Sequence, residues 1–88
     1  MADEFIELIL IWAALGPHAQ TREWLEKQGL TVMPMKSGLL ITGSQRQIEK
    51  VFRVSLDNQQ PPLRLPVPEE LAPHVSSVSW PRPREYHP

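Results

Sequence analysis

The chain has 88 residues, the size of one small domain. Nine Lys and Arg against ten Asp and Glu give a formal charge of −1, so the chain lacks the basic excess that neutralises nucleic-acid phosphates. It has no cysteine, which excludes disulfides, thiolate metal ligands and a cysteine nucleophile. Because the chain lacks a basic excess, nucleic acid is not the expected partner.

The apolar run over residues 5–15 predicts neither export nor a membrane span. It follows Asp3 and Glu4 rather than basic residues, and Glu7 interrupts it, unlike a secretory signal. It is also shorter than the about 20 apolar residues that cross a bilayer as a helix. We therefore expect no membrane partner and a cytoplasmic location.

Residues 4–12 predict the first strand, because β-branched and aromatic residues are frequent there and an apolar set recurs at every second position. Strand alternation gives two faces. The face expected to meet the core is wholly apolar and consists of Ile6, Leu8, Leu10 and Trp12. The opposite face is apolar apart from one charge and consists of Phe5, Glu7, Ile9 and Ile11.

A helix is predicted over residues 18–28, where Gly29 suits the left-handed residue that ends a helix. Residues 30–36 and 39–43 then predict a hairpin, with a Ser-Gly turn at 37–38. Pro34 cannot donate to a strand ladder, so the first of these strands is expected to be interrupted or at an edge.

A second helix is predicted to begin after Ser44. The hydroxyl of Ser44 can accept the N–H three residues on, and Gln47 can reach back to it, as in a capping box. One buried stripe at helical spacing follows, made of Ile48, Val51 and Phe52. This helix is expected to give way to the fourth strand, at residues 54–57.

Most of the ten prolines follow Gln60. Only short elements are predicted among these prolines: an extended stretch at 63–67, a helical turn at 68–71 and an extended segment around 75–78. Residues 79–88 are predicted to be a flexible Pro-rich extension, polyproline-like from Trp80 onward.

The predicted order is strand, helix, strand, strand, helix, strand. This order predicts an α+β fold of the ferredoxin-like βαββαβ class, with two helices on one face of a four-stranded antiparallel sheet. One domain is expected over residues 1–78, followed by the extension at 79–88. The helices would cover one face only, so the other face must meet water, a partner or a second copy.

No catalytic, metal or cofactor site is predicted. His18, His74 and His87 are far apart in the sequence, and none has a metal-ligand partner one helical turn away. The glycines lack the spacing of a phosphate-binding loop. We therefore expect a protein that is not an enzyme and that uses no cofactor.

The sheet face turned away from the helices is the predicted docking surface. Glu7, Ile9 and Ile11 of the first strand are predicted to lie on it. The second hairpin strand adds one of two alternating pairs, Leu39 with Ile41 or Leu40 with Thr42. Monomers rarely expose large continuous apolar patches, so this face predicts a protein partner, a second copy or a cover formed by the C-terminal extension.

Three segments share a pattern with one protein family. They are residues 24–32 (WLEKQGLTV), 39–52 (LLITGSQRQIEKVF) and 68–78 (PEELAPHVSSV). In this order they resemble the propeptide, or activation domain, of sedolisin and kumamolisin serine-carboxyl peptidases. The catalytic residues of that family belong to its peptidase domain, so the resemblance carries none of them onto this chain.

The resemblance implies a non-catalytic domain that inhibits a serine-carboxyl peptidase or assists its folding. The sheet face would dock on the peptidase, and a C-terminal segment with Trp80, Arg82 and Arg84 would run toward the active site. The alternative is a stand-alone ferredoxin-like interaction module of unknown partner, or a homodimer built on the same sheet. RNA binding would need exposed aromatics on the central strands, where Leu40 and Ile41 stand instead.

Overall fold

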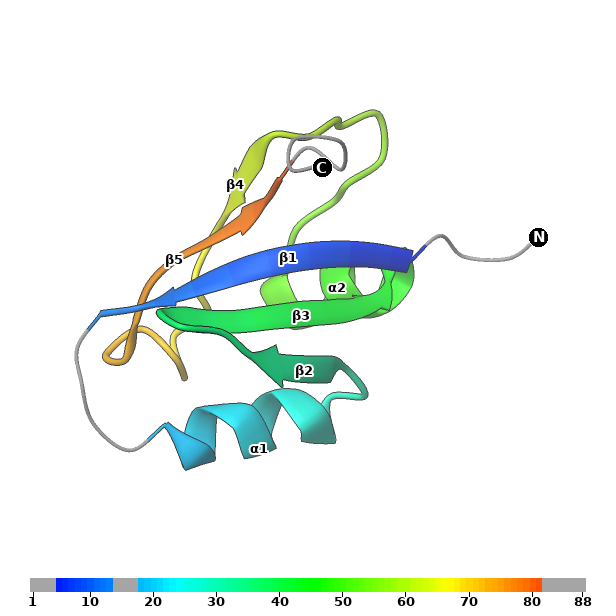
Figure 1. Cartoon of the computed structure of the whole chain (residues 1–88). Coiled ribbons are helices and arrows are strands. Elements are labelled where there is room, and N and C mark those ends of the chain that lie inside the picture. Colours follow the sequence, from blue (N-terminus) through cyan, green and yellow to red (C-terminus); the bar gives the residue numbers. More distant parts are fainter. Residues whose placement is uncertain (1–4, 14–17, 82–88) are drawn as a thin grey trace.

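The computed structural model describes residues 5–13 and 18–81 and contains one sheet and two helices (Figure 1). The strands are β1 (Phe5–Trp12), β2 (Thr31–Pro34), β3 (Gly38–Ser44), β4 (Leu63–Leu65) and β5 (Val75–Trp80), and the helices are α1 (Ala19–Lys27) and α2 (Gln45–Phe52). The predicted α+β class is confirmed.

The strands form a sheet of order β2-β3-β1-β5-β4, and every neighbouring pair is antiparallel. The long strand β1 lies in the centre, between β3 and β5. The predicted hairpin is confirmed as β2 and β3, and β2 is an edge strand that ends at Pro34. The antiparallel sheet therefore agrees with the sequence prediction, but it has five strands and not four.

The predicted fourth strand at residues 54–57 is wrong. The chain leaves α2 through Arg53 in the left-handed conformation, with a φ of 56°, and residues 54–56 form no regular element. The N–H of Leu56 donates to the Glu49 carboxylate at 2.7 Å instead of joining a strand ladder. The edge of β1 that this segment would have filled is occupied by β5.

The two extended pieces predicted after Gln60 both form strands. Between them the Leu71 N–H donates to the Pro68 carbonyl at 2.9 Å, which closes a turn where a helical turn was predicted. Strand β5 continues through Ser79 and Trp80, which were predicted to belong to the extension. The sheet therefore extends two residues past the predicted domain end at residue 78.

The hydrophobic core lies between the helices and one face of the sheet. The predicted core face of β1 is confirmed, because Ile6, Leu8 and Leu10 are at most 3% exposed. Leu25 of α1 and Ile48 of α2 are fully buried against the same cluster. The remaining core residues come from the connection between α1 and β2, from β3, from α2 and from the C-terminal half: Leu30, Leu39, Ile41, Val51, Phe52, Leu56, Leu65, Leu71, Val75 and Val78.

The two helices are joined through Gln47. The predicted capping box is confirmed, because the Gln47 N–H donates to the Ser44 hydroxyl and the Gln47 side chain accepts from the Ser44 N–H, both at 3.2 Å. The Gln47 amide nitrogen also donates to the carbonyl of Gly29, which ends α1 with a φ of 91°. In Figure 1, α2 lies behind β1 and β3, and α1 runs beside β2.

Candidate functional site

The candidate site is the sheet face turned away from the core, which we call the open face. Side chains alternate along each strand, so the residues between the buried positions of β1 point to this face, and the strand registers extend it across the sheet. Its members are Phe5, Glu7, Ile9, Ile11, Thr31, Met33, Leu40, Thr42, Arg64, Ser77 and Ser79. All of them are exposed or half-buried.

The structure places the three predicted residues of β1, Glu7, Ile9 and Ile11, together on the open face. The choice that the sequence left open in the hairpin is settled by burial. Leu39 and Ile41 are 1% and 0% exposed and belong to the core, so Leu40 and Thr42 are the pair on the open face.

One row of side chains crosses all five strands of the open face. The registers place Met33 opposite Leu40, Leu40 opposite Ile9, Ile9 opposite Ser79, and Ser79 opposite Arg64. The row is apolar over β2, β3 and β1 and polar over β5 and β4. We call the adjoining apolar residues over β2, β3 and β1 the apolar half; they are Met33, Leu40, Ile9 and Ile11. Thr31, Thr42 and Glu7 form a polar row that separates them from Phe5.

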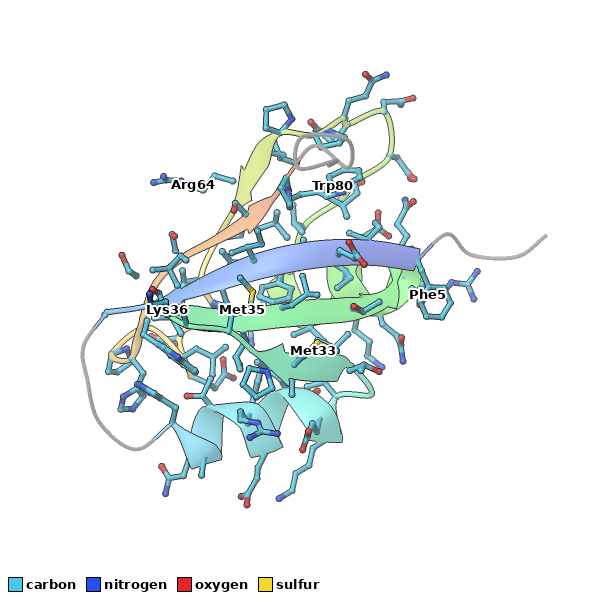
Figure 2. All side chains as sticks on the ribbon, in the orientation of Figure 1. Phe5, Met33, Met35, Lys36, Arg64 and Trp80 are labelled. Carbon is cyan, nitrogen blue, oxygen red and sulfur yellow. The ribbon has the colours of Figure 1, made fainter. Side chains whose placement is uncertain are left out.

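Two of the most exposed large hydrophobic side chains of the described residues lie on the open face. Phe5 is 74% exposed at the start of β1, and Met33 is 59% exposed on the edge strand β2 (Figure 2). Single exposed hydrophobic residues are ordinary, but Met33 adjoins Leu40 and Ile9 in one row. A continuous apolar surface of this kind is typical of a docking site.

Within the described strands two residues are charged, Glu7 in β1 and Arg64 in β4. Both lie on the open face, and their charges are opposite. The turn between β2 and β3 adds exposed Met35 and Lys36 at the hairpin end of the sheet (Figure 2).

Both edges of the sheet are poorly suited to pairing with another strand. Strand β2 ends at Pro34, which has no N–H to donate. Strand β4 has three residues and stands between Pro61-Pro62 and Pro66. Short edges and prolines prevent edge-to-edge pairing. A partner is therefore expected on the open face and not at an edge.

Trp80, the aromatic residue predicted to contact a partner, is not on the open face. It follows Val78 by two positions in β5, so it points to the core side, where it is half-buried and packs against the core. Arg82 and Arg84, the other two residues predicted in the C-terminal contact, lie outside the described residues.

Trp12, which was predicted to face the core, is half-buried and packs against the core cluster, as does Trp24 of α1. The Trp12 ring stacks on the imidazole of His18, with centroids 3.7 Å apart and planes 3° apart. His18 is half-buried in this stack. The contact joins the end of β1 to the start of α1.

Five members of the open face, Thr31, Met33, Arg64, Ser77 and Ser79, were not predicted from the sequence. The position of Met33 could have been predicted, because it is next to Val32, whose side chain packs against the core, and neighbouring strand residues point to opposite faces. The position of Arg64 could not, because the face on which it lies depends on the register between β4 and β5.

In the part of the chain that the structure describes, no three His, Asp or Glu side chains lie together as metal ligands, and no helix is long and apolar enough to cross a membrane. No protein-family model, no curated protein and no solved structure matches the chain. A proposal for its function therefore depends on the open face and on the sequence resemblance.

Proposed function

We propose that this chain is a non-catalytic protein-binding domain whose open face is the docking surface. The observation that carries the proposal is the apolar half of that face, where Met33, Leu40, Ile9 and Ile11 remain partly or largely exposed. Removing apolar surface from water stabilises a complex by about 25 cal/mol per Å². A partner that covers this half would gain the main driving force of protein association.

We assign the fold to the ferredoxin-like class. The elements β1, α1, β2, β3, α2 and β5 supply its βαββαβ order, and β4 is an additional edge strand inserted before the last of them. This assignment explains why the open face exists: the class places its helices on one side of the sheet. Domains with this arrangement have one sheet face available for binding.

We further propose a serine-carboxyl peptidase as the partner. The support is the resemblance of three segments to peptidase propeptides. In the fold these segments supply the end of α1 with the start of β2, then β3 with α2, and finally the turn before β5 with most of β5. They therefore include all of α2 and most of β3 and β5, two of the strands that contribute to the open face. The role would be inhibition of the peptidase or assistance in its folding.

The experiment is an inhibition assay with a sedolisin-type peptidase at acidic pH. The purified chain should inhibit the enzyme, and Ile9→Lys should abolish the inhibition because it places a charge in the apolar half of the open face. Ala72→Lys is the matched control, since Ala72 is exposed in the turn before β5. If the chain at micromolar concentration neither inhibits nor binds the enzyme, the peptidase is not the partner.

A further inference from the structure

We propose that in the free protein a second copy of this chain covers the open face, in a symmetric dimer with two Glu7–Arg64 ion pairs arranged around Ile9. This inference rests on the proposed function only in taking the open face as the docking surface. It requires no peptidase, and a peptidase would have to displace the second copy.

The charges of the open face are self-complementary. In a two-fold symmetric interface every contact occurs twice, so a charged residue must meet an opposite charge from the same surface patch. The strands provide one acid, Glu7, and one base, Arg64, on that face. The whole chain has a formal charge of only −1, so two copies repel each other little.

The positions of the two charges fit a two-fold axis that passes near Ile9 and lies in the plane of the interface. Glu7 is two residues from Ile9 along β1, a distance of about 7 Å. Arg64 is two strands from Ile9 along the row, a distance of about 10 Å in the perpendicular direction. An axis that bisects these two directions brings Glu7 of each copy near Arg64 of the other, within reach of the long arginine side chain.

The same axis also matches the apolar residues. Ile11 lies on the opposite side of Ile9 from Glu7, and Met33 lies on the opposite side of Ile9 from Arg64. The symmetry operation that exchanges Glu7 with Arg64 therefore places Ile11 of one copy over Met33 of the other. Charges meet opposite charges, apolar side chains meet apolar side chains, and Ile9 meets its own counterpart.

The arrangement defines how the two sheets cross. An axis midway between the strand direction and the direction across the strands sets the strands of the two copies at roughly 90°. This is the orthogonal class, one of the two ways in which sheets commonly pack face to face. Strands β2 and β4 supply side chains to the interface, but their proline-flanked backbone edges pair with no strand of the second copy, which agrees with their poor suitability for pairing.

The test is sedimentation equilibrium of the full chain with charge-reversal variants, without any peptidase. The unaltered chain should dimerise. Glu7→Arg and Arg64→Glu should each weaken the dimer at least about tenfold, because each puts two pairs of like charges in contact. The double variant should recover most of the affinity. Glu26→Arg and Lys50→Glu, which make the same charge changes at exposed helix positions, should leave the dimer unchanged.

Three results would overturn the proposal: a strictly monomeric chain at millimolar concentration, a dimer insensitive to the single reversals, or no recovery in the double variant. Circular dichroism of each variant establishes that it is folded. Because no peptidase is present, the oligomeric state is measured independently of the inhibition assay, and either result can fail alone.

Discussion

At the residue scale, Gly38 is required by close packing of two backbones. A Cβ at this position would overlap the carbonyl oxygen of Leu10, and its register partner in β1 is Ile11 of the open face. Backbone atoms cannot move aside as a flexible side chain can. Gly38→Ala should therefore lower the free energy of unfolding by about 1–3 kcal/mol, as overpacking does.

Urea denaturation followed by circular dichroism measures this effect. Ser37→Ala, at the exposed neighbouring position, is the control and should change little. An unfolding midpoint of Gly38→Ala equal to that of the unaltered chain would show that β1 and β3 are not so closely paired at this point.

Leu8 and Ile9 are neighbours in sequence but should respond in opposite ways to substitution. Leu8 is fully buried, so Leu8→Ala should cost about 2–5 kcal/mol of folding free energy. Ile9 lies on the open face, so Ile9→Lys should change stability far less but should abolish association. Thermal unfolding together with light scattering separates the two effects. Equal losses of stability would contradict the assignment of the faces.

At the element scale, α2 depends on its cap for its position. The Ser44 hydroxyl accepts the Gln47 N–H, so Ser44→Ala should destabilise the fold by about 1 kcal/mol. Gln47→Ala should cost more, because Gln47 also bonds the Gly29 carbonyl and so links α2 to α1. Chemical denaturation of both variants checks the order, and a smaller loss for Gln47→Ala would contradict it.

The helices and the hairpin were predicted well from the sequence. The features that indicate the helices, such as the capping box and the helix-ending Gly29, involve residues only a few positions apart. The predicted Ser-Gly turn was displaced, since Gly38 opens β3 and the Met35 N–H bonds its carbonyl at 2.9 Å. The strand at 54–57 failed for a longer-range reason. The Glu49 carboxylate binds the N–H of Leu56, and β5, from the other end of the chain, pairs with β1.

At the scale of the whole molecule, residues 5–13 and 18–81 form two short helices and a sheet of five strands. Both helices belong to the core side, so the other face has no cover among the described residues. Alternation in β1 predicted which face this would be. The complete open face could not be predicted, because the position of Arg64 follows from the pairing of β4 with β5, which no local pattern in the sequence specifies.

The most direct test of the docking surface uses the absence of cysteine from the sequence. A single thiol introduced as Met33→Cys reports on the open face, and one introduced as Ala72→Cys reports on an exposed turn away from it. The rate of maleimide labelling at position 33 should fall as protein concentration rises, while the rate at position 72 stays constant. A labelling rate at position 33 that stays constant at every protein concentration, and after addition of the peptidase, would contradict docking on the open face.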